Sequence, residues 1–199
     1  RQVTAALLPL LEDPSPMVRR RATQALASSA AANRSLEKLS DPSRSVRLAA
    51  ALGLSGAHQP IPAGRAQQDW DEYLQFNRDR PQSLLLAANH ARTAGELAQV
   101  QQYIERGIQL DQLNPQIYHQ SAIILSASGL SQVAEQTLYK GWELAPRNPI
   151  FPYSLGLLAA EADQLEQAIG FLEESVALEP RFGRAWYNLS LAYQKLNRP

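Results

Sequence analysis

The chain has 199 residues, of which 45% are hydrophobic and 19% are charged, proportions typical of a folded globular protein rather than a disordered one. Nineteen Lys and Arg residues balance nineteen Asp and Glu residues, and this zero net charge argues against general binding of polyanions. The absence of cysteine excludes disulfides, thiolate metal sites, a cysteine nucleophile and covalent haem attachment within the chain.

The first sixty residues contain a phrase that recurs after 28 positions. Residues 11–19 read LEDPSPMVR and residues 39–47 read LSDPSRSVR, so that an Asp-Pro-Ser turn precedes a Val-Arg pair in each copy. We interpret residues 1–57 as helical repeats, and we expect Ser15 or Ser43 to cap the helix that follows it. The chain begins with Arg rather than Met, and we therefore expect a processed form or a piece of a longer protein.

This Asp-Pro…Val-Arg phrase resembles the HEAT-like repeat. In that family the Asp and Arg side chains of successive units pair along the stack. The resemblance therefore implies structural roles for Asp13, Arg19, Asp41 and Arg47.

A break in composition follows at residues 58–64 (HQPIPAG), where two prolines and a glycine interrupt helical periodicity. We place a linker at residues 58–65. The charges support a boundary here, because residues 1–65 hold nine basic and four acidic residues whereas the remainder holds ten and fifteen.

A second period, of 34 residues, runs through the rest of the chain. It gives three units, at 81–114, 115–148 and 149–182, and a partial fourth at 183–199. Apolar residues spaced three and four apart predict two helices in each unit. We expect Asn-Pro pairs at 114–115 and 148–149 to begin helices, and Gly95 and Gly129 to form left-handed turns between helices.

These units resemble the tetratricopeptide repeat (TPR). The third unit has Leu155-Gly156, Ala168 and Pro180 at the signature positions of that family, and residues 66–80, with Trp70, fit a preceding half-unit. Together the two resemblances imply an all-α, right-handed helical-hairpin solenoid, in which HEAT-like repeats at residues 1–57 are followed by a TPR array at residues 66–199.

The order of the repeats resembles the C-terminal tail of bacterial multihaem c-type cytochromes. A W-x-x-Y-L phrase at 70–74 and an Asp-Arg-Pro phrase at 79–81 carry this resemblance. It implies a periplasmic protein whose haems are bound upstream, on Cys-x-x-Cys-His motifs, so we expect no cofactor in this chain.

The candidate catalytic and metal-binding patterns in the sequence are incomplete. The three histidines, His58, His90 and His119, lack the spacing of a metal-binding helix, and residues 53–56 (GLSG) lack the lysine of a phosphate-binding loop. No apolar run approaches the ~20 residues of a membrane-spanning helix. We therefore expect neither an enzyme, nor a metal site, nor a membrane span.

In TPR arrays the first helix of each hairpin lines a concave surface that binds protein or peptide partners. Carried over by position, the predicted groove consists of Asn89, Arg92, Gln116, His119, Ile123, Tyr153, Leu157, Arg184, Tyr187 and Leu191. Tyr153 and Tyr187 occupy equivalent positions and would form an aromatic platform for a peptide. Leu85 stands where the carboxylate clamp of the family has a lysine, so we do not expect recognition of a C-terminal carboxylate by that route.

Three other interpretations stay open at this point. A basic face containing residues 19–21 (RRR), Arg34, Arg44 and Arg47 would bind nucleic acid. Alternatively, the chain is a structural tail packed on an upstream domain, or a downstream helix covers the two tyrosines. The incomplete fourth unit also predicts an exposed apolar face at Trp186, Leu189 and Tyr193, through which copies of the chain would associate.

Overall fold

A computed structural model describes residues 2–27, 29, 32–57 and 59–196 of the chain. Arg1, His58 and residues 197–199 lie outside this part, and with them the first residue of the predicted linker and the end of the predicted fourth unit. The described residues form helices joined by turns and contain no strand, so the predicted all-α class is confirmed.

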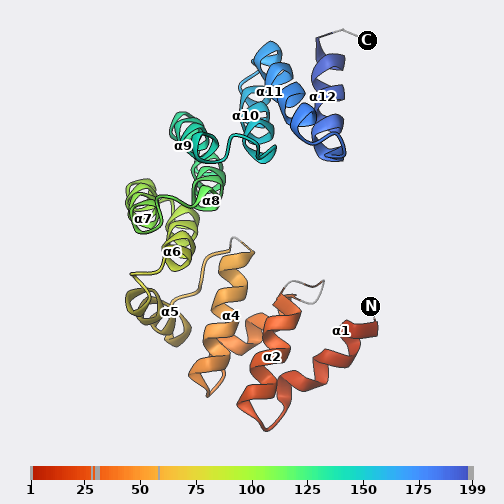
Figure 1. Ribbon diagram of the computed structural model, residues 1–199. Helices are drawn as coiled ribbons and strands as arrows, with labels where there is room; N and C mark the ends of the chain where they lie inside the picture. Colours follow the sequence, from red (N-terminus) through yellow and green to blue (C-terminus); the bar gives the residue numbers. More distant parts are fainter. Residues whose placement is uncertain (1, 28, 30–31, 58, 197–199) are drawn as a thin grey trace. The chain divides into compact units, whose positions relative to one another are not determined.

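The chain divides into two compact units, Arg1–Tyr103 and Ile104–Pro199, here called unit 1 and unit 2. The division falls inside α7 (Leu97–Leu110), and not in the predicted linker. Figure 1 shows the helices of both units, with labels on most of them. The assignment of residues 1–57 to HEAT-like repeats and of residues 66–199 to a TPR array stays a prediction about the type of repeat.

Unit 1 begins with two similar segments, each made of a short helix, a 3-10 turn and a longer helix. The described elements are α1 (Gln2–Leu7), η1 (Leu8–Glu12), α2 (Pro16–Ala27), α3 (Ala32–Leu36), η2 (Glu37–Ser40), α4 (Arg44–Gly56), α5 (Arg65–Phe76) and α6 (Pro81–Thr93). Helices α2 and α4 pack side by side (Figure 1). Leu11, Ala22 and Leu26 form a buried cluster at the start of this unit.

The turns before α2 and α4 are held by aspartates. Asp13 Oδ1 accepts from the backbone N–H of Ser15 at 2.8 Å, and Asp41 Oδ1 accepts from that of Ser43 at 2.9 Å. The cap predicted for Ser43 is wrong, because its side chain makes no capping bond and its hydroxyl lies 3.0 Å from that of Ser45. The carboxylate two residues earlier accepts from the N–H of Ser43 itself, as in an Asx turn.

Arginine–aspartate pairs join successive segments of unit 1. Arg19 donates twice to the Asp41 carboxylate, at 2.8 and 3.0 Å, which confirms the pairing implied by the HEAT resemblance. The hydrogen bond from Arg19 lowers the pKa of Asp41 below its ordinary value. Arg47 donates to Asp69 at 2.7 Å, and Asp69 lies in α5, 28 positions after Asp41. The two pairs, Arg19–Asp41 and Arg47–Asp69, form a ladder that continues beyond the predicted linker.

The side chain of Trp70 adds an apolar contact at the same place. It is fully buried and forms one cluster with Ala51 and Leu54 of α4 and with Ile61 of the proline-containing connection. Helix α5 consequently packs on α4 within one compact unit, although the connection between the two helices breaks helical periodicity as the sequence predicts.

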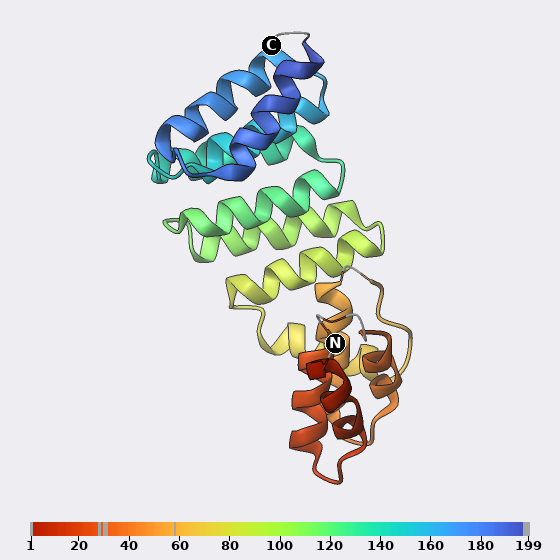
Figure 2. The same cartoon turned by 90° about the vertical axis from the view of Figure 1, so that its right-hand side faces the viewer.

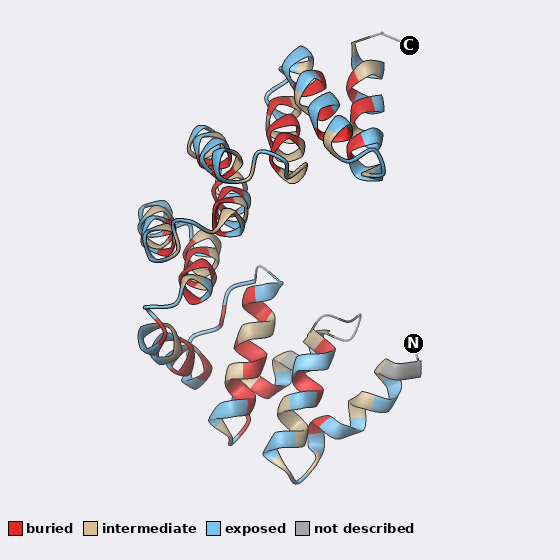
Figure 3. Ribbon diagram, viewed as in Figure 1, coloured by how far each residue is buried: buried red, intermediate tan, exposed pale blue. Residues whose placement is uncertain are grey.

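Unit 2 consists of helical hairpins. Its described helices after α7 are α8 (Pro115–Ala127), α9 (Ser131–Leu144), α10 (Ile150–Glu161), α11 (Leu165–Leu178) and α12 (Gly183–Lys195). Helix α8 packs against α9, α10 packs against α11, and α12 adds to α11, as the green-to-blue part of Figure 2 shows. The buried residues, red in Figure 3, lie on the sides of these helices that face a neighbouring helix. A side chain at Gly156 would place its Cβ 2.8 Å from Leu172, so glycine permits the close approach of α10 and α11.

The predicted helix starts and turns of the 34-residue units agree with the structure to within one residue. Asn114 caps α8 by accepting from the N–H of Gln116 at 3.0 Å, whereas α10 begins at Ile150, one residue later than predicted, with Asn148 accepting from its N–H. Gly95 and Gly129 have φ of 78° and 76°, so the predicted left-handed turns are confirmed. Asp163 holds the equivalent place in the third unit with φ of 59°, and aspartate is one of the few residues other than glycine that adopt this left-handed conformation readily.

We expect Gly129→Ala to lower the free energy of unfolding by about 1 kcal/mol, because alanine is disfavoured at positive φ. Nothing lies within 4 Å of the added Cβ, so backbone strain alone would cause the loss. Gly170→Ala is the control, because Gly170 also has open space around it but sits inside α11, where alanine should raise stability by about 0.5–1 kcal/mol. Urea unfolding followed by circular dichroism measures both changes, and equal midpoints for the two variants would contradict the assignment of the turn.

Candidate functional site on the first helices of unit 2

A hollow of about 390 Å³ lies between α8 and α10. Two residues of the predicted groove, Ile123 and Leu157, line it. Its other lining residues are Ala122, Ser126, Ala127, Leu138, Ser154, Leu158 and Glu161. Most of this surface is therefore aliphatic, with two hydroxyls and one carboxylate.

The helical period explains why these side chains meet. Ser154, Leu157, Leu158 and Glu161 are spaced three and four apart, so they form one stripe along α10. On α8 the neighbours of Ile123 in sequence, Ala122 and Ile124, are buried, whereas 55% of the Ile123 surface is exposed. A large aliphatic side chain thus remains uncovered inside a hollow. Sequence reasoning missed Ser154, Leu158 and Glu161, although their spacing from Leu157 could have identified them.

His119 lies one helical turn before Ile123 and joins the two helices. Its Nε2 is 3.1 Å from the hydroxyl of Ser154, and its ring meets the ring of Phe151 edge-on at 6.1 Å between centroids. Burial lowers the pKa of His119 below its ordinary value, so the ring is neutral near pH 7. His119 accordingly acts as a neutral bridge at the edge of the hollow.

The two tyrosines of the predicted platform have different surroundings. The ring of Tyr153 lies 4.8 Å from that of Phe182, and its hydroxyl accepts from Asn188 at 3.3 Å. Tyr187 is 65% exposed, and within the described part of the chain it makes no ring contact with Tyr153. Phe182, which immediately precedes α12, takes the place beside Tyr153 that the prediction gave to Tyr187.

The remaining predicted residues do not line the hollow. Gln116 lies exposed near the start of α8, and Arg184 and Leu191 are exposed on α12. Asn89 and Arg92 belong to unit 1, where Arg92 donates to the Asn89 side chain at 3.3 Å.

The predicted apolar face of the fourth unit is partly wrong. Trp186 is half exposed, but Leu189 is buried in the cluster that α12 forms with Leu172 and Val176. Tyr193 is partly buried and donates to Glu173. Helix α12 thus covers α11 with two of the three side chains that were predicted to be free, Leu189 and Tyr193.

Ion pairs take up most of the charge on the predicted basic face. Acidic side chains lie within 3.2 Å of the following basic residues of unit 1: Arg19, Arg34, Lys38, Arg44 and Arg47. In the described part of residues 1–65, only Arg20, Arg21 and Arg65 have no such partner. Fewer free cations are left for phosphate contacts than the sequence indicates, which weakens the nucleic-acid interpretation.

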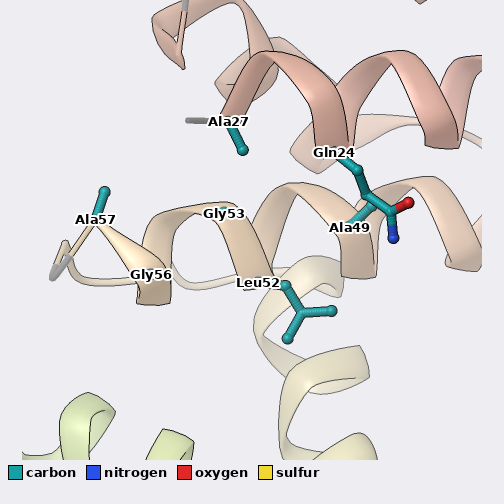
Figure 4. A pocket seen from close by; sticks show the side chains of 7 residues that line it. All are labelled: Gln24, Ala27, Ala49, Leu52, Gly53, Gly56 and Ala57. Carbon is teal, nitrogen blue, oxygen red and sulfur yellow. The ribbon is translucent and has the colours of Figure 1, made fainter. Parts of the chain in front are cut away.

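A second hollow, of about 600 Å³, lies between α2 and α4 (Figure 4). Its wall consists of Gln24, Ala27, Ala49, Leu52, Gly53, Gly56 and Ala57, and it contains no charged group. Across the described residues, no three His, Asp or Glu side chains gather as a metal site would require, and no helix is long and apolar enough to span a membrane.

Comparison with known proteins gives one family match and several structural matches. The HEAT repeat family model matches residues 3–30. MamA has a TM-score of 0.53 and 20% identity over 66% of this chain and 77% of its own. YrrB, described as a TPR protein with an unusual peptide-binding site, has a TM-score of 0.53 and 14% identity over 92% of this chain and 97% of its own.

A third structure, the Cut9–Hcn1 hetero-tetramer of the APC/C, has a TM-score of 0.55 and 18% identity over 98% of this chain and 40% of its own. No curated protein matches the sequence significantly. The resemblance of the repeat order to multihaem cytochrome tails, with the periplasmic location it implies, stays a prediction. The matches support, at the level of the fold, a helical-repeat chain of the HEAT- and TPR-like kind.

Proposed function

We propose that this chain is a non-catalytic scaffold that binds an extended segment of a partner protein in the hollow between α8 and α10. The observation that carries the proposal is the exposed Ile123 beside Leu157 in a hollow of about 390 Å³. That volume lies within the range of ordinary ligand pockets, and an apolar side chain inserted there would remove both residues from water.

The polar groups of the hollow indicate how a segment would be oriented. Ser126 and Ser154 offer hydroxyls on opposite helices, and Glu161 is the last residue of α10. The carbonyl groups at a helix C-terminus carry partial negative charge, and they add to the charge of the Glu161 carboxylate. A partner segment with an aliphatic anchor followed by Lys or Arg fits this arrangement. YrrB, with its peptide-binding site, supports binding of this kind on a related fold.

Selection from a phage-displayed library of random peptides, with the full chain as bait, tests the proposal. We expect enriched peptides to combine an aliphatic residue with a basic one. Ile123→Ser should weaken their binding at least tenfold in fluorescence anisotropy, because it removes the exposed aliphatic wall, and Ala127→Trp should block the hollow. Leu113→Ser is the matched control, because Leu113 is 80% exposed in the turn before α8 and does not line the hollow.

The proposal fails if no peptide is enriched over a bait-free selection. It also fails if Ile123→Ser and Leu113→Ser bind the enriched peptides equally well. Circular dichroism of each variant excludes unfolding as the cause of lost binding.

A further inference from the structure

Three aromatic rings gather on the second helices of unit 2. Tyr139 and Trp142 belong to α9 and Phe171 to α11, and we call them the aromatic triad. The Tyr139 and Trp142 rings are 6.5 Å apart with 21° between their planes, and Phe171 meets both at 6.3 Å and steep angles. All three side chains are at least partly exposed, Tyr139 by 38%.

The repeat fold does not require these rings. One period of 34 residues earlier, the position of Tyr139 holds Glu105, and that of Trp142 holds Ile108. Trp142 is fixed further by a hydrogen bond from its indole N–H to the carbonyl of Pro146 at 3.2 Å. A rigid, partly exposed aromatic group confined to one pair of helices is the composition that protein interfaces favour at their centres.

Three carboxylates lie one helical turn from rings of the aromatic triad. Glu135 and Glu143 lie one helical turn before and after Tyr139, and Glu174 lies one turn after Phe171. Within the described part of the chain none of the three carboxylates has an ion-pair partner. Burial raises the pKa of Tyr139, and the charge of Glu135 raises it further. Lys140 on α9 and Arg147 in the turn after it are the nearby cations in sequence.

We propose that the aromatic triad and its three carboxylates form a docking surface for an arginine-rich segment of a partner protein. A guanidinium group stacks flat on the rings while it donates hydrogen bonds to a carboxylate. Arginine fits better than lysine, because its planar group matches the ring faces and is less strongly hydrated. An apolar partner would bury the carboxylates unpaired, and a nucleic acid would be repelled by them.

Calorimetric titration of the full chain with an acetylated, amidated tetra-arginine peptide at low salt tests this proposal. We expect saturable binding that weakens with salt, at least tenfold weaker binding of tetra-citrulline, which keeps the shape but loses the charge, and weaker binding of tetra-lysine. Tyr139→Leu should reduce the affinity for tetra-arginine at least fivefold, because it removes a ring face but no charge.

Two control variants separate this surface from general attraction. Trp186→Leu removes another exposed indole that donates to a proline carbonyl, outside the aromatic triad, and should bind tetra-arginine as the unaltered chain does. Glu105→Gln removes one exposed carboxylate at the position equivalent to Tyr139 and should have little effect. Equal affinity for tetra-arginine and tetra-citrulline, no binding at low salt, or a loss in Glu105→Gln as large as in Tyr139→Leu would overturn the proposal. The substitutions at the aromatic triad do not touch the hollow between α8 and α10. The proposal for this surface and the proposal for the hollow can therefore be refuted separately.

Discussion

Replacing Trp70 by alanine is expected to lower the free energy of unfolding of unit 1 by about 4 kcal/mol. The side chain is fully buried against α4 and Ile61, so truncation loses its burial and leaves a cavity that helices on both sides can fill only in part. Its indole N–H has no hydrogen-bond partner among the described residues, so the loss would come from packing and not from a polar contact.

Hydrogen exchange of the α4 amides, measured with increasing urea, reports the stability of this region. Trp186→Ala provides the control, because Trp186 is half exposed in unit 2 and its removal should leave exchange in α4 unchanged. The protection of the α4 amides in Trp70→Phe should lie between that in the unaltered chain and that in Trp70→Ala, since phenylalanine keeps part of the buried ring surface. If Trp70→Ala leaves the α4 amides as protected as Trp186→Ala does, then α4 and α5 do not share a core.

The sequence around Trp70 shows what periodicity can and cannot predict. The resemblance to the TPR identified residues 66–80 as a half-unit, in which the helix runs over Arg65–Phe76, and two prolines correctly marked the connection before it. Prolines report only that the helix stops, however, because they fix φ and remove a backbone donor. They do not prevent Ile61, between them, from entering the core, where it is 7% exposed. The packing of α5 on α4 therefore could not be predicted from the connection alone.

The candidate site was predicted in part for a similar reason. The repeat register places Ile123 and Leu157 on first helices at positions of the same face, and both line the hollow. The register does not predict where side chains outside the helices lie, and Phe182 is one of these residues. It lies against Tyr153 and so removes that ring from the predicted platform. Side chains in turns are set by the local path of the backbone, which the repeat pattern does not encode.

We expect Asp69→Ala to destabilise unit 1 by about 3 kcal/mol, because it leaves the buried guanidinium of Arg47 without its carboxylate. Both side chains are only 10% exposed, and the Asp69 carboxylate accepts from Arg47 at 2.7 Å and from Arg44 at 3.2 Å. Glu72→Ala is the matched control. It removes an exposed partner of Arg44 on the same helix, where surface ion pairs contribute less than about 1 kcal/mol.

The double variant Arg47→Met with Asp69→Leu tests whether the ion pair stabilises unit 1 or only offsets the cost of burying its two charges. Arg47 also donates to the backbone carbonyls of Asp41 and Pro42, so its loss frees acceptors in the turn before α4. If the double variant recovers most of the stability lost in Asp69→Ala, the cost of that variant is the unpaired charge. If it does not, the bonds from Arg47 to the turn matter as much as the ion pair. Urea unfolding monitored at the α4 amides decides between these outcomes, and equal stability of Asp69→Ala and Glu72→Ala would contradict a structural role for the ladder at this junction.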